Sequence, residues 1–163
     1  MTDHKEWGLV RIDDRLIHGQ VVAGWVRSKK FSKIHIVDDT VAADPFLVDV
    51  LRFSAPADLL VNAESFDNSL VSLQQDQNPQ ETMILLKSPV VALRLWEAGV
   101  RFMALNVGGI GIAPGRTKVF QDISLSVEEY NMLRQMFLNG VKITFLSVPG
   151  EPSKDFTDIP VIK

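Results

Sequence analysis

One short segment of the chain concentrates the side chains that could do chemistry. Residues 13–20, with the sequence DDRLIHGQ, place a histidine, an arginine and two carboxylates next to one another. The neutral imidazole of His18 would be a good nucleophile near pH 7, and its attack on a phosphoryl donor would give a covalent nitrogen–phosphorus intermediate. The guanidinium of Arg15 could bind the phosphate oxygens bidentately. The segment therefore predicts phosphoryl transfer through His18, with Arg15 stabilising the charge.

Four further residues of this segment are expected to complete the site. Asp13 or Asp14 could orient the arginine or fix the imidazole tautomer. Gly19 gives the backbone conformations that other residues avoid, and it lets a bulky group approach closely. A helix is expected to begin at Gln20, where the free N–H groups of the first turn favour an anion. From the residues alone, the carboxylates could equally be turn residues, and the histidine could be an ordinary solvated side chain.

The segment lies where a fold of alternating strands and helices would place a functional loop. Apolar runs rich in β-branched residues alternate with segments of helical spacing, helix-start signals and helix-stop signals. This alternation favours an α/β fold with an open, mostly parallel sheet, helices on both faces and a single domain. Strands are expected at 9–12, 34–37, 59–61, 82–86, 102–105 and 141–148, and helices at 20–27, 45–53, 63–73, from Pro89 to Gly99 and from Ser126 to Gly140.

Two further loops, 38–43 and 106–117, also follow predicted strands, and functional residues in such folds lie at the carboxyl ends of strands. The carboxylate pair of the first loop could line the same cleft or only end a strand. The glycine-rich loop could cradle an anion, although it has neither the glycine spacing of a dinucleotide-binding fingerprint nor the Gly-Lys-Ser/Thr of a P-loop. The candidates in these loops are Asp38, Asp39, Asn106, Gly108 and Gly109.

Composition limits the classes of protein to consider. The chain has 163 residues, of which 46% are hydrophobic and 23% charged, as is typical of one globular domain. The absence of cysteine excludes thiol catalysis and disulfides, and a net charge of −3 does not suggest a nucleic-acid binder. Because no apolar run could span a membrane and residues 1–7 form a polar leader unlike a signal peptide, a soluble, cytoplasmic protein is expected. His35, inside a predicted strand, is expected to be structural.

The string VRIDDRLIHGQV at 10–21 resembles the active-site signature of the IIB components of the mannose/fructose/sorbose class of sugar phosphotransferase systems. Similar stretches follow in the family's order: VDD at 37–39 with VA at 41–42, AP at 55–56 and NVGG at 106–109. The resemblance implies that residues 1–163 form a single IIB phosphocarrier domain with a parallel α/β sheet. It also implies that His18 carries the phosphoryl group, that Arg15 stabilises it, and that no metal or organic cofactor takes part.

The resemblance further implies the partners of the protein. Such carriers accept the phosphoryl group from the histidine of a IIA protein and deliver it to a sugar held by membrane-embedded IIC and IID proteins. The expected protein is therefore a protein-histidine–sugar phosphotransferase at the inner face of the plasma membrane, and a homodimer is an option. Four basic side chains become candidates for docking the IIA protein: Arg11, Arg27, Lys29 and Lys30.

Two other functions stay open at this point. A magnesium-dependent hydrolase could use the carboxylate oxygens of Asp13, Asp14, Asp38 and Asp39 as metal ligands. A regulatory protein could keep the carrier fold and use its phosphorylated state to signal rather than to feed transport.

Overall fold

The computed structural model describes residues 4–163 of the chain. The strands in that range are β1 (Leu9–Asp13), β2 (Lys33–Val37), β3 (Leu60–Glu64), β4 (Thr82–Leu86), β5 (Ala104–Gly109), β6 (Thr117–Phe120), β7 (Ile123–Leu125), β8 (Lys142–Phe145) and β9 (Lys154–Asp155). The α-helices are α1 (Gly19–Ser28), α2 (Asp39–Ala42), α3 (Pro45–Ser54), α4 (Phe66–Gln74), α5 (Pro89–Glu97) and α6 (Val127–Leu138).

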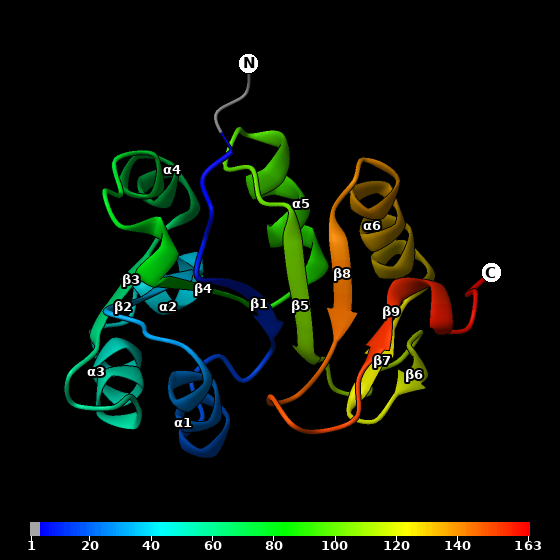
Figure 1. Ribbon diagram of the computed structural model, residues 1–163, viewed down its shortest axis with the longest axis horizontal. Coiled ribbons are helices and arrows are strands. Elements are labelled where there is room, and N and C mark those ends of the chain that lie inside the picture. The colour runs from blue at the N-terminus through cyan, green and yellow to red at the C-terminus, as the bar shows by residue number, and fades with distance from the viewer. Residues whose placement is uncertain (1–3) are drawn as a thin grey trace.

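Seven of the strands form one sheet, in the order β3-β2-β4-β1-β5-β8-β9 (Figure 1). Neighbouring strands are parallel except β8 and β9, which run antiparallel. β6 and β7 form a separate antiparallel hairpin. The predicted open, mostly parallel sheet is therefore confirmed, and β1 lies in its middle, where the chain leaves the sheet into the loop that carries His18.

Helices cover both faces of the sheet because its inner strands are apolar on both sides. In β4, Met83 and Leu85 join the core that includes side chains of α1 and α3, whereas Ile84 and Leu86 join the core that includes side chains of α5 and α6. All four side chains are at most 1% exposed. Successive residues of a strand point to opposite faces, so a strand covered on both faces is a continuous apolar run. Burial of each such side chain contributes about 1.5–3 kcal/mol.

Local capping signals set several helix ends where the sequence predicts them. The carboxylate of Asp44 accepts hydrogen bonds from the amides of Phe46 and Leu47, at 3.0 and 3.4 Å, and so begins α3. Ser126 forms the predicted capping box with the third residue of α6. Gly99, with φ of 104°, ends the turn after α5 in the left-handed conformation that glycine tolerates.

The helix predicted over 63–73 begins later than expected. Ala63 and Glu64 belong to β3, where they pair with Ile36 and Val37 of β2. The hydroxyl of Ser65 then accepts a hydrogen bond from a backbone amide in the first turn and caps α4. Pairing with a neighbouring strand therefore overrides the helical spacing of the apolar residues.

Two other predicted strands have wrong boundaries, and short elements were not predicted. The strand expected at 102–105 is β5, which begins at Ala104 and continues to Gly109. The strand expected at 141–148 is β8, which ends at Phe145 because the carbonyls of Leu146 and Ser147 accept hydrogen bonds from side chains instead. The elements that were not predicted are α2, β6, β7 and β9, each of two to four residues.

His35 has the structural role that its place in a strand predicts. Its side chain is buried on β2, and Nε2 lies 3.0 Å from the hydroxyl of Ser69 in α4. Burial lowers the pKa of His35, because the charged ring would lose its hydration; the charge of Lys33 adds to this, while Glu64 and Asp76 oppose it. Below about pH 6.5, His35 therefore binds a proton in the unfolded chain but stays neutral in the folded protein until its lowered pKa is reached.

We expect the free energy of unfolding to fall as the pH drops from about 6.5 toward the lowered pKa of His35. The slope from one such group is at most about 1.4 kcal/mol per pH unit. The variant His35→Gln does not titrate and should lack this part of the slope, whereas the other histidines are common to both proteins. Urea denaturation between about pH 7.5 and about pH 5.5 measures the difference. Parallel curves for the two proteins would contradict this account.

Candidate functional site

Asp13, the last residue of β1, is the centre of the site. Its carboxylate is completely buried. Oδ1 accepts hydrogen bonds from the backbone N–H of Arg15 at 3.1 Å and from its Nε at 3.3 Å. Oδ2 lies 3.0 Å from Nη2 of Arg11 and 3.4 Å from Nε2 of His18. One buried carboxylate thus contacts both the predicted nucleophile and the predicted phosphate-binding arginine.

The backbone between Asp13 and His18 folds back on itself. Leu16 has φ of 57°, in the left-handed region, and its N–H donates to the carbonyl of Asp13 at 2.9 Å. This conformation costs a residue with a side chain about 1–2 kcal/mol. Leu16 and Ile17 are buried in the core that also includes α1, which offsets the cost. Burial of Leu16 and Ile17 thereby fixes the position of His18 at the end of the loop.

His18 is the N-cap residue of α1, but its side chain does not cap the helix. The ring faces Asp13, and 28% of the side chain is exposed. The carbonyl of His18 accepts hydrogen bonds from Val21 and Val22 at 3.1 and 3.2 Å. The imidazole therefore lies beside the first turn of a helix, where backbone N–H groups and the helix dipole favour an anion.

Gly19 and Gln20 follow His18 at the start of α1. The prediction that Gly19 supplies an unusual backbone conformation is wrong, because the left-handed residue of the loop is Leu16. A Cβ on Gly19 would come no closer than 4.0 Å, to the carbonyl oxygen of Ser54, so an approaching group has space there. The side chain of Gln20 lies outside the described residues.

Arg11 is a buried part of the site. Its side chain is 2% exposed, and it lies two residues before Asp13 on the same face of β1. Nη1 donates to Oδ1 of Asn106 at 2.5 Å and to the carbonyl of Leu146 at 2.9 Å. Burial lowers the pKa of Arg11, and the neighbouring carboxylate opposes that shift. The docking role predicted for Arg11 is wrong, because a buried guanidinium presents no surface to a partner.

The glycine-rich loop at 106–117 lies beside the loop that carries His18, because β5 pairs with β1. A Cβ on Gly108 would lie 2.0 Å from Cζ of Arg11, so the guanidinium fits only because this residue is glycine. The N–H of Asp14 donates to the carbonyl of Gly109 at 3.0 Å. The carboxylate of Asp14 accepts from the N–H of Gly111 at 2.7 Å. Asp14 thus connects the two loops.

Arg116, which sequence reasoning missed, holds the far end of the glycine-rich loop. Its Nη1 donates to the carbonyl of Gly111 at 2.8 Å. Its Nε and Nη2 bind the carboxylate of Glu129 at 3.1 and 2.7 Å, and this hydrogen bonding raises the pKa of Arg116. The first turn of α6 therefore anchors the loop that faces Asp14.

Asp38 and Asp39 lie on another part of the carboxyl edge, since β4 separates β2 from β1. Asp38 accepts a hydrogen bond from the N–H of Val41 and Asp39 from the N–H of Phe66, each at 2.8 Å, so both bind backbone groups at helix starts. Across residues 4–163, no group of three or more acidic, histidine or cysteine side chains is placed to hold a metal ion. The four carboxylates of the magnesium hypothesis are thus not brought together.

The exposed basic residues predicted for docking lie at different distances from His18. Arg27 lines an open hollow of about 580 Å³ that also includes Gly19, beside the functional loop. Arg27 lies in the last turn of α1, and Lys29 and Lys30 follow that same end of the helix; Lys30 pairs with Glu81 at 3.1 Å, just before β4 begins. Of these three residues, Arg27 is therefore the one that shares a surface with the site.

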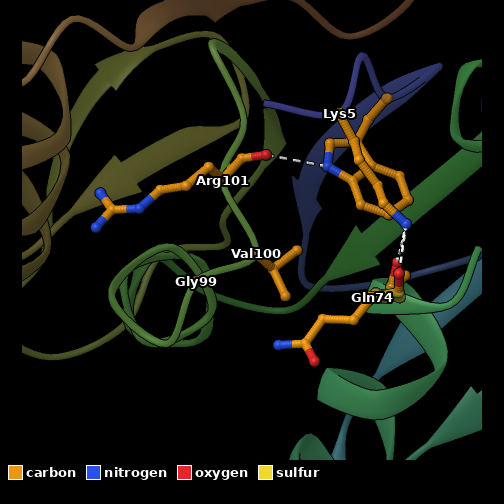
Figure 2. A pocket seen from close by; sticks show the side chains of 7 residues that line it. Lys5, Gln74, Gly99, Val100 and Arg101 are labelled. Carbon is orange, nitrogen blue, oxygen red and sulfur yellow. Dashed lines mark hydrogen bonds between the residues drawn. The ribbon is translucent and has the colours of Figure 1, made fainter. Parts of the chain in front are cut away.

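Another pocket lies at the amino ends of the strands, away from His18. Figure 2 shows this pocket, of about 110 Å³, between Lys5, Val100 and Arg101. Nζ of Lys5 donates to the carbonyls of Leu73, Gln74 and Asp76 at 3.1, 2.6 and 2.9 Å. In the described part of the predicted leader, Lys5 therefore donates hydrogen bonds to the carbonyls at the end of α4. Residues 1–3 lie outside the described residues.

Comparison with known proteins agrees with this fold. A family model described as the sorbose subfamily IIB component of the PTS system matches residues 7–163. The sorbose-specific EIIB component of Klebsiella pneumoniae is 32% identical over 151 residues, which cover 92% of each chain. The mannose-specific EIIAB component of Escherichia coli is 32% identical over 162 residues, and this chain spans 49% of that protein's length.

Solved structures of such components superimpose closely on this chain. The IIBSor domain of the sorbose permease from Klebsiella pneumoniae gives a TM-score of 0.86 at 32% identity, covering 94% of this chain and 95% of that domain. The manxB structure from Thermoanaerobacter tengcongensis gives 0.83 at 29% identity, covering 91% of both. In the described part of the chain, no helix is long and apolar enough to cross a membrane. From its sequence, its fold and its relatives, the chain belongs to the sorbose subfamily of phosphotransferase-system IIB components.

Proposed function

We propose that this chain is a phosphoryl carrier that takes the group onto His18 from the phosphohistidine of a IIA protein and passes it to a sugar. The observation that carries the proposal is the position of Nε2 of His18, 3.4 Å from Oδ2 of Asp13. Arg15, whose side chain is 51% exposed, extends from the same carboxylate. Membership of a family of IIB components supports the same function.

In this proposal Asp13 holds the imidazole in the form that acts as a nucleophile. A carboxylate accepts hydrogen bonds and donates none, so the ring nitrogen that faces it carries the proton. The lone pair of His18 then lies on Nδ1, which we assign as the attacking atom. The partly exposed side chain can be reached by a protein donor.

The transfer takes two steps, and the only other species released is the proton of the sugar hydroxyl. In the first, Nδ1 of His18 attacks phosphorus; a nitrogen–phosphorus bond forms while the donor's own nitrogen–phosphorus bond breaks, and the electron pair returns to the donor imidazole. In the second, a sugar hydroxyl oxygen attacks phosphorus, the bond to His18 breaks, and the hydroxyl proton passes to solvent. In both steps Arg15 stabilises negative charge on the transferring oxygens.

The partners in the proposal are a soluble donor and a membrane-embedded acceptor. The name of the mannose-specific EIIAB relative joins an A and a B component, which supports a IIA donor for this chain. We assign the acceptor sugar to IIC and IID proteins, so the carrier works in the cytoplasm at the inner face of the membrane. Among the residues that the structure describes, the magnesium hydrolase has no matching arrangement of carboxylates to support it.

The test of this function is phosphorylation with phosphoenolpyruvate, the general phosphorelay proteins and a IIA protein. Acid-labile, base-stable phosphate on the peptide that contains His18, located by mass mapping, supports the proposal. Label on another peptide, or no label, rejects it. Membrane vesicles that contain IIC and IID, with a sugar, should then discharge the protein. Label that persists would reject the transport role and favour a regulatory one.

Arg15→Ala is expected to slow phosphoryl transfer by about 10²–10³-fold, because the charge on the transferring oxygens loses its counter-ion. The free energy of unfolding should change by less than about 1 kcal/mol, since the Arg15 side chain is half exposed. Arg15→Lys keeps the charge without the bidentate geometry, so its rate should lie between those of the wild type and Arg15→Ala. Rapid-quench labelling measures the rates, and an unchanged rate for Arg15→Ala would remove this residue from the mechanism.

Arg27→Glu is expected to raise the IIA concentration that gives half-maximal labelling by about 5- to 10-fold, because charges at the rim of an interface steer association. Lys30→Glu makes the same change of charge three residues further on, just past the end of α1, where the side chain pairs with Glu81 instead of lining the hollow beside Gly19, and it is the matched control. Titration of the labelling rate with the IIA protein, at low and high salt, separates the two variants. Equal effects of both substitutions would show that only net charge matters.

A further inference from the structure

We propose that Arg11 is a positioning residue of the phosphoryl site, which neutralises Asp13 and thereby leaves Arg15 free for the phosphoryl group. This inference rests on the proposed function of His18. It assigns a role to a side chain that never touches the transferred group, since its guanidinium is buried on β1.

The two oxygens of Asp13 are divided between different partners. Oδ2 is shared by Nη2 of Arg11 at 3.0 Å and Nε2 of His18 at 3.4 Å. Oδ1 accepts from Arg15, whose backbone N–H at 3.1 Å is closer than its Nε at 3.3 Å. The tighter side-chain contact of this carboxylate is therefore with the buried arginine rather than the exposed one.

Exposure separates the roles of the two arginines. The Arg11 side chain is 2% exposed, whereas the Arg15 side chain is 51% exposed. A fully buried carboxylate without a counter-ion is unfavourable, and it would repel a phosphoryl anion that approaches the neighbouring imidazole. With Arg11 in place, the buried pair is neutral. The charge of Arg15 then stays available at the surface, where a donor must deliver the group.

The guanidinium of Arg11 has a fixed position. Nη1 donates to Oδ1 of Asn106 and to the carbonyl of Leu146 at 2.9 Å, so β5 and the end of β8 both hold it. The missing side chain of Gly108 makes room for it, since a Cβ there would lie 2.0 Å from Cζ. The guanidinium carbon also lies 5.6 Å from the centre of the Trp25 ring. A lysine has one compact ammonium group and cannot reproduce these directed contacts.

Arg11→Lys tests the proposal, with Arg52→Lys, an exposed arginine on α3, as the matched control. Phosphorylation by the IIA protein should slow by about 10- to 100-fold in Arg11→Lys, because small errors in positioning cost this much. The ring ¹⁵N signals of His18 in the unphosphorylated protein should change from a single tautomer toward a mixture. The control should match the wild type in both readouts. Wild-type rates and ring signals in Arg11→Lys would overturn the proposal.

A second comparison covers the case in which Arg11→Lys does not fold. The double variant Arg11→Met, Asp13→Asn removes both buried charges together, a change that buried pairs often tolerate. If Arg11 acts through Asp13, the double variant and Asp13→Asn should transfer at rates within about 2-fold of each other. A double variant much slower than Asp13→Asn would show that Arg11 acts by another route. If the wild type takes no label, the proposed function fails, while the ring signals of His18 still test Arg11.

Discussion

Replacing His18 with glutamine is expected to reduce phosphoryl labelling by more than about 10³-fold, to background. The amide cannot form the nitrogen–phosphorus bond, and loss of a nucleophile is the largest single loss that such a site can suffer. The fold should be unaffected, with a change of less than about 0.5 kcal/mol in the free energy of unfolding, because the His18 side chain is partly exposed and leaves Leu16 and Ile17 to anchor the loop.

The other histidines are the matched controls for this experiment. His4→Gln and His35→Gln should each keep the acid-labile label, since His35 is buried against Ser69 and His4 precedes the amino end of β1, whereas His18 follows its carboxyl end. Labelling is followed with phosphoenolpyruvate-derived phosphate. Circular dichroism on the same samples checks that each variant is folded. A labelled His18→Gln protein would move the carrier to another residue.

Gly108→Ala is expected to give the largest loss of stability of any glycine substitution near the site. The added Cβ would meet the guanidinium of Arg11 at 2.0–2.2 Å, and the guanidinium cannot move without leaving the carboxylate of Asp13. Breaking a buried ion pair costs about 3–5 kcal/mol. We therefore expect a loss of at least about 3 kcal/mol, with loss of labelling in whatever protein remains folded.

Glycines further along the same loop provide a graded comparison. A Cβ on Gly109 would lie 3.1 Å from Oδ1 of Asp13, and one on Gly111 would lie 3.2 Å from Oδ2 of Asp14. These contacts need shifts of only a few tenths of an ångström, so each alanine variant should lose about 1 kcal/mol or less. Urea denaturation of the three variants measures the order. A Gly108→Ala protein as stable as the other two would show that the guanidinium can be displaced at little cost.

The sequence could predict those parts of the molecule that depend on nearby residues. The strand at 82–86 is a continuous apolar run, and its predicted bounds agree with the structure because it is buried on both faces. The capping box of Ser126 and Glu129 lies within four residues and is equally local. The loop at 13–20 could be located for the same reason, because it follows a recognisable strand directly in the sequence.

The role of Arg11 could not be predicted in the same way. A basic residue in a single strand reads as a surface side chain until its neighbours are known. Its surroundings come from β5, about 95 residues later, where the parallel register places Asn106 opposite Arg11. One local signal was available: Arg11 and Asp13 are two residues apart in a strand and so share a face. The left-handed Leu16 likewise depends on the core that buries it.

The two residues of β9 have a consequence for how copies of this protein meet. Lys154 and Asp155 are exposed, and they pair antiparallel with Phe145 and Thr144 on β8. An unprotected edge strand offers its backbone to other chains, and very short, charged edges oppose such pairing. This end of the sheet therefore resists the edge-to-edge growth that leads to aggregates, even though the inner strand β4 is buried along its whole length.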